Sequence, residues 1–262
     1  EEKAWMELFR VFVGEKEDVT ANRIGILGMT PQDISDLRAA DRIRERFAAE
    51  GKTAVCYGMG NGLDDVKKAS SVEKNIVAAP AALEAAKYLE RTYGTPYEIG
   101  YPLVDELVRD MDYQGKKVLV VQQQVTGNAI REEILKKAPD AQVTVASWFM
   151  MKPELRRDED LHLRDEEDYI KLVETGSYDV IYADPCMARM TPKFEGVFVD
   201  TVHFAVSGKL VTVEAAKDSK ELKEPGKLKE SKKTREVKEP GKQGGHDHCD
   251  YDRMNPMGEA YE

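Results

Sequence analysis

Cysteine is scarce in this sequence. Only three of its 262 residues are cysteines, and Cys56, Cys186 and Cys249 lie far apart. Three widely spaced thiols cannot form a disulfide framework, so we expect a protein of the reducing cytoplasm. Iron–sulfur clusters usually require four thiolates, so we also expect the isolated chain to bind no such cluster stoichiometrically.

Long apolar runs are missing as well. No segment approaches the roughly 18–20 apolar residues that a membrane-spanning helix needs. The opening residues, EEKAW, lack the basic start and apolar segment of a secretory signal peptide. We therefore expect neither a membrane partner nor secretion. The first residue is not methionine, and we expect further residues upstream.

Basic residues are outnumbered, with 39 Lys and Arg against 49 Asp and Glu, and the net charge is −10. The stretch 217–242 has ten basic and six acidic residues, a net of +4, which leaves −14 for the rest of the chain. An acidic body repels phosphate backbones, so nucleic acid is not expected as a partner.

The apolar patterning alternates between strands and helices. Trp5, Leu8, Phe9 and Phe12 have the spacing of one helix face. After them, short apolar segments bounded by glycine predict strands, and each of these is followed by a helical segment. The strands expected in the first half span residues 21–28, 53–57 and 75–78.

One helix has a clear start signal. In the sequence Thr30-Pro-Gln-Asp33, threonine can cap the helix, proline suits its first position, and the carboxylate faces the exposed amides. We expect this helix to continue towards Glu50 and to end at Gly51.

A second strand–helix series begins after Gly115. Strands are expected at 117–121, 143–149, 178–183 and 197–199, and helices at 128–137 and 165–174.

This order predicts an α/β protein with two Rossmann-like parallel-sheet units. We expect a linker helix at 1–20, the first unit at 21–113, the second at 114–215 and a disordered charged tail at 216–262. The tail repeats Lys-Glu-Pro-Gly-Lys and has almost no apolar residues, so it cannot offset its ordering entropy. Ligands in such sheets bind beyond the carboxyl ends of the strands.

A glycine-rich turn follows the second strand, with Gly58, Gly60 and Gly62. The dinucleotide-binding fingerprint needs its third glycine three residues after the second, and the next strand lacks the acidic residue that would hold a ribose. We interpret the turn as a tight one that brings the backbone, at Gly60, near a ligand.

His203 directly follows the last predicted strand, where a parallel sheet opens onto its crevice. It can be a ligand or catalytic residue, or a hydrogen-bonded structural histidine. The three glutamines at 122–124 end another strand, and their amides can bind a polar ligand or pair with backbone. Cys186 can ligate metal or fill the core, whereas Cys56 is expected in the core.

The densest potential metal ligands are His246, His248 and Cys249 near the end of the chain. Imidazole and thiolate donors suit zinc, nickel or copper. The segment supplies no surrounding groups to orient these donors, so a weak site for a divalent metal is as well supported as a dedicated one.

Several stretches, in this order, resemble nitrogenase component 1-type oxidoreductases over roughly residues 1–213. The segment 22–33 (NRIGILGMTPQD) is similar to the opening strand and turn of the family's second subdomain. The segment 75–96 (NIVAAPAALEAAKYLERTYGTP) is similar to its ligand loop and following helix. Residues 115–135, and 178–210 ending VHFAVSGKL, resemble the first and last parts of the third subdomain.

The resemblance implies the C-terminal part of a reductase subunit. Such a subunit would accept electrons from an ATP-dependent iron–sulfur protein and reduce a small molecule or a tetrapyrrole-type substrate. It would pair with a homologous component 1 subunit or with itself. An iron–sulfur cluster is implied for the complete complex, with its ligands in the first subdomain, which this chain lacks.

Two positions match the residues that hold the metal cofactor in the catalytic subunit of nitrogenase. The family's cysteine falls at Ala79, and its C-terminal histidine falls at His203. Without the thiolate, an iron–molybdenum cofactor is not expected. We predict that His203 is catalytic and faces the cleft between the two units. The residues expected to contact a cofactor or substrate are Gly60, Ala79, Gln123, Gln124, Thr126, Asn128 and Ser207.

Two other functions remain open from the sequence. The chain can be a non-catalytic binding, scaffold or metal-delivery protein that retains the fold. An unrelated small-molecule α/β enzyme would need a paired base and nucleophile, which the sequence does not display.

Overall fold

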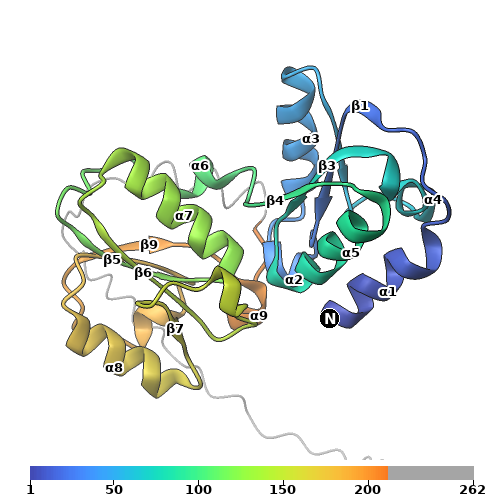
Figure 1. Cartoon of the computed structure of the whole chain (residues 1–262). Coiled ribbons are helices and arrows are strands. Elements are labelled where there is room, and N and C mark those ends of the chain that lie inside the picture. Colours follow the sequence, from blue (N-terminus) through green and yellow to red (C-terminus); the bar gives the residue numbers. More distant parts are fainter. Residues whose placement is uncertain (212–262) are drawn as a thin grey trace, which may run out of the picture. The chain divides into compact units, whose positions relative to one another are not determined.

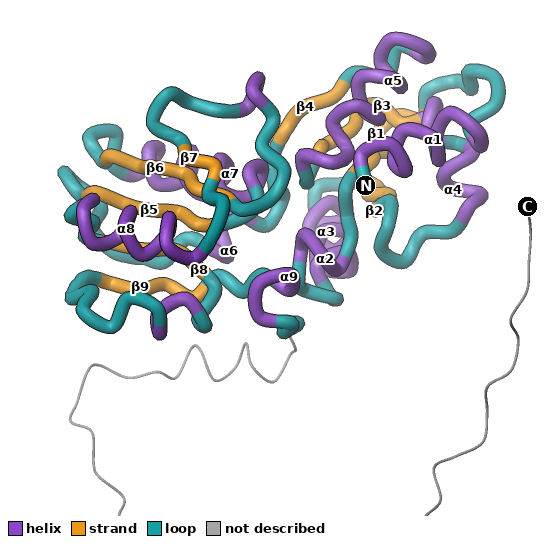
Figure 2. The backbone as a smooth tube through the Cα atoms, turned by 90° about the horizontal axis from the view of Figure 1, so that it is seen from below, coloured by secondary structure: helices purple, strands orange, loops and turns teal. Residues whose placement is uncertain are grey.

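The computed structural model describes residues 1–211 (Figures 1 and 2). The predicted tail at 216–262, with its repeat and with His246, His248 and Cys249, lies outside the described residues. Every ladder between neighbouring strands in the described part is parallel, and the strands form two sheets. This arrangement confirms the predicted α/β class with two Rossmann-like units. No helix in residues 1–211 is long and apolar enough to cross a membrane.

The first sheet has the strand order β2-β1-β3-β4. Its strands alternate along the chain with helices, as a parallel sheet requires. The strands are β1 (Thr20–Leu27), β2 (Thr53–Cys56), β3 (Val72–Val77) and β4 (Tyr97–Ile99). The helices are α1 (Glu2–Phe12), α2 (Pro31–Ile34), α3 (Ala39–Ala49), α4 (Leu63–Lys67), α5 (Leu83–Tyr93) and α6 (Val104–Leu107), with short 3-10 turns η1 (Ala69–Ser71) and η2 (Pro80–Ala82).

Both faces of this sheet are buried, which explains why its strands read as continuous apolar runs. On β1, Leu27 packs with α1 and α5 in one hydrophobic core. Its neighbour Ile26 points to the opposite face and packs with α3 in a second core. The alternation of side chains along a strand thus divides one apolar run between two layers of helices.

The second sheet has the order β7-β6-β5-β8-β9. Here too each strand is parallel to its neighbours. The strands are β5 (Lys117–Val121), β6 (Gln142–Ser147), β7 (Leu161–His162), β8 (Val180–Ala183) and β9 (Val197–Asp200). The helices are α7 (Gln124–Lys137), α8 (Glu166–Gly176) and α9 (Phe204–Ser207), with 3-10 turns η3 (Pro153–Leu155) and η4 (Met187–Arg189).

The same division of side chains recurs in the second sheet. Val120 of β5 packs against Ile130 and Ile134 of α7. Leu119 points the other way and packs with Tyr169 of α8. A buried ion pair between Arg131 and Asp160 anchors α7 beside β6, with Nη1 and Oδ1 2.5 Å apart.

The structure corrects one predicted helix. The segment from Thr30 towards Glu50 is not continuous, because α2 ends at Ser35 in the left-handed region (φ 60°) and α3 begins only at Ala39. Because the helix is interrupted there, the Ser35 carbonyl and hydroxyl can accept hydrogen bonds from residues 204–211. The Ser35 hydroxyl accepts a hydrogen bond from the Phe204 amide at 2.7 Å, and the Ser35 carbonyl accepts one from the Val211 amide at 2.8 Å.

Some boundaries and short elements also differ from those predicted. Helix α7 begins at Gln124 rather than Asn128, because Gln123 caps it by accepting a hydrogen bond from the Val125 amide. The strands β4 and β7 were not predicted, since three and two residues are too short for a periodic pattern to show.

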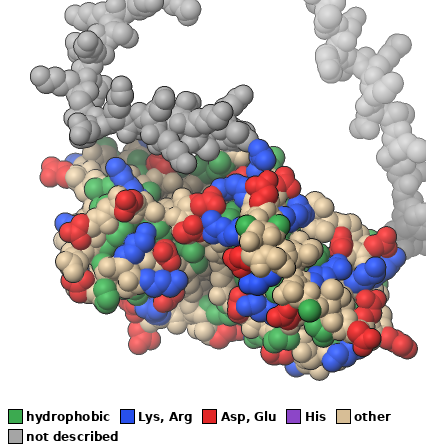
Figure 3. Space-filling view, turned by 90° about the horizontal axis from the view of Figure 1, so that it is seen from above, with side chains coloured by type: hydrophobic (Ala, Val, Ile, Leu, Met, Phe, Trp, Pro, Cys, Tyr) green, Lys and Arg blue, Asp and Glu red, His purple; other side chains and the backbone are tan. Residues whose placement is uncertain are grey.

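Charged side chains of both signs form ion pairs on the surface of the described residues. On the face shown in Figure 3, Lys and Arg are interspersed with Asp and Glu. Many of them form ion pairs between elements, such as Arg46 on α3 with Asp105 on α6 and Lys87 on α5 with Glu154 in η3.

Candidate functional site

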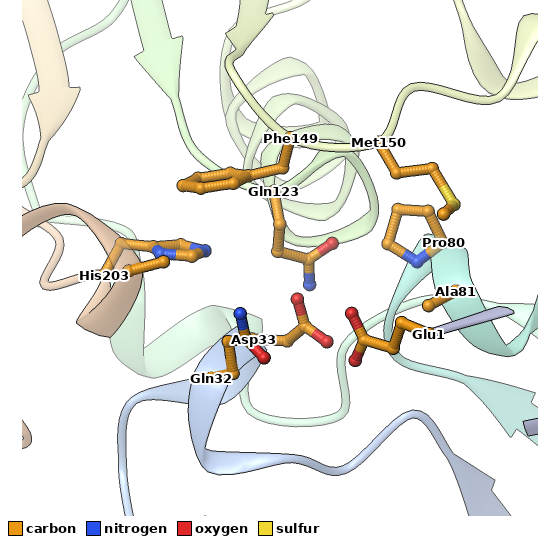
Figure 4. A pocket seen from close by; sticks show the side chains of 10 residues that line it. Glu1, Gln32, Asp33, Pro80, Ala81, Gln123, Phe149, Met150 and His203 are labelled. Carbon is orange, nitrogen blue, oxygen red and sulfur yellow. The ribbon is translucent and has the colours of Figure 1, made fainter. Parts of the chain in front are cut away.

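A pocket of about 230 Å³ lies where the carboxyl ends of several strands converge (Figure 4). Segments that follow strands of the first sheet contribute Gln32, Asp33, Pro80 and Ala81. Segments that follow strands of the second sheet contribute Gln123, Phe149, Met150, His203 and Ala205. Glu1, just before α1, completes the lining. This is the position at which α/β sheets bind ligands.

His203 lies between β9 and α9, and its side chain is directed into the pocket (Figure 4). The residue is 2% exposed, and its ring stacks on the phenyl ring of Phe149 with centroids 4.1 Å apart. Neither ring nitrogen has a hydrogen-bond partner among residues 1–211. Burial lowers the pKa of His203 to about 4, so the imidazole is neutral at physiological pH. A neutral imidazole offers one donor and one acceptor to a ligand.

The backbone around His203 is held by a buried carboxylate. Asp184, after β8, accepts hydrogen bonds from the His203 amide at 2.9 Å and the Ser207 hydroxyl at 2.7 Å. It also accepts one from the Cys186 amide at 3.0 Å. Burial opposes ionisation of Asp184, but these hydrogen bonds outweigh it and hold the pKa below its usual value. Asp184 therefore fixes where His203 enters the pocket.

A pair of carboxyl groups faces the pocket from its other side. Asp33 in α2 and Glu1 point toward one another (Figure 4), close enough to share a hydrogen bond. The Thr30 hydroxyl donates to the second oxygen of Asp33 at 3.1 Å. Burial and the neighbouring Glu1 carboxylate raise the pKa of Asp33 to about 7. Asp33 is thus poised to exchange a proton near neutral pH.

Gln123 connects the two groups of lining residues. Its side-chain amide donates to the Ala78 carbonyl at 2.8 Å and to the Thr126 hydroxyl at 2.7 Å. Its amide oxygen accepts from the Val125 amide, so the side chain is fully engaged by the protein. Gln123 shapes the floor of the pocket, while His203 retains free hydrogen-bonding capacity among the described residues.

Other predicted contact residues lie near the pocket without lining it. Thr126 is buried against Gln123. The Gln124 amide exchanges two hydrogen bonds with the backbone of Lys152. The Asn128 amide donates to the Leu155 carbonyl and accepts from Arg131. These three polar groups position backbone and neighbouring side chains.

Ala79, Gly60 and Ser207 also do not line the pocket. Ala79 is fully buried against Gly28, where an added Cβ would lie 2.9 Å from the Ala79 Cβ. Gly60 (φ 76°) faces the Arg44 guanidinium group. The Ser207 hydroxyl is bonded to Asp184. The pocket instead borders the residues directly after Ala79, namely Pro80 and Ala81.

The described cysteines do not contribute to the pocket. Cys56 lies within a core of the first sheet, and Cys186 packs at the edge of a core of the second. Burial raises the pKa of each thiol to about 11, which keeps both protonated. Residues 1–211 contain no group of three or more His, Cys, Asp or Glu side chains arranged to hold a metal ion.

Asp33 and Phe149 are two of the lining residues that the sequence does not indicate. Asp33 was interpreted as a carboxylate facing helix amides, but the Thr30 side chain makes no cap bond, and Asp33 turns to the pocket. Phe149 was placed in a strand that actually ends at Ser147. Both residues follow the carboxyl end of a parallel strand, and this position is the sequence feature that could have indicated a role in the site.

Comparison with known proteins shows the fold alone. No family model and no curated protein sequence matches the chain. The structure is similar to "Nitrogenase Cp1 at pH 6.5", with a TM-score of 0.53 and 13% identity over 75% of this chain. The match spans 56% of the nitrogenase chain, so this chain corresponds to about half of it. A Trypanosoma cruzi protein assigned as an aspartate carbamoyltransferase aligns over 82% of the chain and 88% of its own, at 12% identity and a TM-score of 0.29, too low to carry an argument.

Proposed function

We propose that the chain forms the C-terminal part of a subunit of a nitrogenase-like reductase. In this proposal the complete complex accepts electrons from an ATP-dependent iron–sulfur protein and reduces a small molecule bound in the pocket. The observation that carries the proposal is His203, a buried imidazole with two unbonded ring nitrogens among the described residues, directed into a pocket of a nitrogenase-like fold.

The pocket size favours a small substrate over a tetrapyrrole. The cavity volume is about 230 Å³, below the roughly 300–1,000 Å³ typical of pockets that bury drug-sized ligands. A tetrapyrrole macrocycle is larger than this cavity. The proposal is therefore limited to a small molecule whose reacting part fits between Asp33 and His203.

The described residues do not fit a nitrogenase-type metal cofactor. The described pocket lining offers one imidazole and two carboxyl groups but no thiolate, and the sequence resemblance assigns Ala79 to the position of the family's cysteine. We therefore derive no step through such a cofactor. The cluster that passes electrons would be held by residues other than 1–211, in the complete subunit or its partner.

The pocket residues can supply the protons that reduction consumes. Each pair of electrons added to a substrate is commonly accompanied by two protons. Asp33, with a pKa of about 7, is protonated in a large fraction of molecules at neutral pH and can be reprotonated there. Neutral His203 can donate through one ring nitrogen and accept through the other, which orients the substrate.

Electron transfer in the complete complex tests the proposal. The full-length protein would be purified anaerobically with its partner subunit and mixed with the iron–sulfur protein and MgATP. We expect a change in the electron paramagnetic resonance spectrum of the complex that requires ATP, a result that does not depend on knowing the substrate. The variant His203→Asn should retain this change while losing substrate turnover, and His162→Asn, on the exposed strand β7, should retain both.

A complex that takes up no electrons under these conditions would overturn the proposal. That outcome would favour the second candidate, a non-catalytic binding or scaffold protein, which is consistent with the lack of metal-ligand groups in residues 1–211. Metal delivery through His246, His248 and Cys249 concerns residues outside the described part and remains a sequence-based hypothesis.

A further inference from the structure

The charged side chains of the pocket lining are all acidic, although Glu1 also carries the α-amino group of this chain. They are the carboxyl groups of Asp33 and Glu1, and no Lys or Arg is among the described lining residues. Lys3 and Lys152 each lie two residues from a lining residue in the sequence, but neither is part of the lining, and Lys152 forms an ion pair with Glu2. The two facing carboxyl groups repel each other when both are ionised, and a bound cation would relieve that repulsion.

A second observation places a ligand against these carboxyl groups. His203 is 2% exposed, and both ring nitrogens lack a partner among the described residues although the ring is directed into the pocket (Figure 4). An unpaired buried polar atom costs free energy, so a ligand that bonds the imidazole is favoured over an apolar one. The unprotonated ring nitrogen requires an N–H or O–H donor from that ligand.

The remaining walls select an organic ligand over a metal ion. Pro80, Ala81, Phe149, Met150 and Ala205 line the pocket with apolar surface. Ca²⁺ takes six to eight oxygen ligands, whereas the described lining has two carboxyl groups, and Mg²⁺ held by two carboxylates keeps several waters, which these apolar walls cannot hydrogen-bond. An anion would meet the carboxyl groups with no basic side chain to balance them.

We propose that the pocket binds a small organic cation with several N–H donors, of the amidinium or guanidinium type. Its charged group lies between Asp33 and Glu1, donates to the free nitrogen of His203, and its apolar body lies against Phe149 and Met150. This inference rests on the proposed function insofar as the cation is the substrate of the reductase, and it gives the charge class of that substrate.

Three probes of matched shape test the inference on the full-length chain without any redox partner. Benzamidine, benzamide and benzoate differ mainly in charge, and their dissociation constants would be measured by isothermal titration calorimetry and ligand-observed NMR. We expect benzamidine to bind at least tenfold more tightly than benzamide, and benzoate to bind least. A charge-assisted hydrogen bond contributes about 1.5–3 kcal/mol, so Asp33→Asn should weaken benzamidine about 10- to 100-fold.

Matched variants separate the pocket from the general acidic surface. Asp64→Asn removes an exposed carboxylate on α4, away from the lining, and should leave the benzamidine affinity unchanged. Asp33→Asn should leave benzamide binding nearly unchanged, which also shows that the variant is folded.

Several results would overturn the inference. Equal or tighter binding of benzamide or benzoate, no binding of any probe, or a preference for benzamidine that survives in Asp33→Asn would each do so. Displacement of benzamidine by Mg²⁺ or Mn²⁺ in an Asp33-dependent manner would replace the organic cation with a metal ion. All these outcomes are independent of whether the complex takes up electrons, so a failure here is distinguishable from a failure of the proposed function.

Discussion

The imidazole of His203 stacks on the phenyl ring of Phe149, with the ring planes 12° from parallel. The contact joins the segment after β9 to the segment after β6, two strands that are not neighbours in the sheet. Phe149 thereby covers one face of the imidazole and contributes to the burial that keeps it neutral. The stacking contact therefore both packs the two segments together and lowers the pKa of His203.

Replacing Phe149 should therefore change the pKa of His203. In Phe149→Ala the ring face is opened to water, and we expect the pKa to rise from about 4 towards its ordinary value of 6.5. The cost in stability should be about 2 kcal/mol, less than for a fully buried phenylalanine. Titration of the histidine resonances by NMR measures the shift. Phe12→Ala, on the exposed face of α1, should leave the His203 titration unchanged.

The buried histidine also predicts a loss of stability in acid. The folded-state pKa of His203 lies near 4 and the unfolded-state value near 6.5, so between these values the unfolded chain binds more protons. The contribution is fully present above pH 6.5 and is lost as the pH falls towards 4, by up to about 3 kcal/mol. Urea unfolding of the wild type and His203→Asn at several pH values should show a smaller acid loss in the variant. An identical pH dependence would mean that His203 is not buried in solution.

Much of the fold is predictable from the sequence because its strands are buried on both faces. The apolar runs around Val118–Val121 and Val180–Ala183 predict buried strands, because they are short and alternate with helical segments along the chain. The candidate site is less predictable from the sequence than the fold. Residues 32–38 contain no glycine or proline and give no sign that α2 ends at Ser35. The break is stabilised by hydrogen bonds to Phe204 and Val211, about 170 residues away.

The residues of the candidate site illustrate the same limit. His203 was singled out because a histidine after a parallel strand is conspicuous. Asp33 was not, because its sequence context, Thr-Pro-Gln-Asp, has a sufficient local explanation in helix capping. Only the three-dimensional structure shows that Thr30 bonds Asp33 itself and that the carboxyl group faces Glu1.

Asn128 provides a test of which polar residues belong to the site. The sequence places it among the contact residues, whereas its side chain is bonded to the Leu155 carbonyl and to Arg131. Asn128→Ala should lower the free energy of unfolding by about 1–2 kcal/mol, because it removes two hydrogen bonds. The benzamidine affinity should remain at the wild-type value. A tenfold weaker affinity would return Asn128 to the binding site.

Asp184 should control His203 without contacting the ligand. In Asp184→Ala three donors lose their acceptor, and we expect a loss of about 2–4 kcal/mol in the free energy of unfolding. Asp184→Asn keeps an acceptor oxygen and should be milder. If Asp184 positions His203, both variants should lower the affinity for benzamidine. The loss of affinity should increase with the disorder of the 201–207 segment, which amide hydrogen exchange measures. A stability loss with unchanged exchange and affinity would reduce Asp184 to a purely structural role.

The pH dependence of cation binding is the sharpest expectation for Asp33. Its pKa is raised to about 7 by burial and by Glu1, and the Thr30 hydroxyl donates a hydrogen bond to it. The neutral imidazole of His203 and the α-amino group of Glu1 belong to residues that line the same pocket. A bound cation favours the ionised carboxylate, so the affinity for the cation should rise as the pH increases through 7 and level off above it.

The stability of the folded protein should have the opposite pH dependence. Because the folded state binds the Asp33 proton more tightly than the unfolded state, this group's contribution to stability falls as the pH rises from about 4 to 7. In Asp33→Asn both slopes should flatten together, and carboxyl ¹³C NMR of the wild type should show the pKa fall on addition of benzamidine. An affinity that is independent of pH between 6 and 8, with Asp33 titrating near 4, would contradict the carboxyl pair on which the cation site depends.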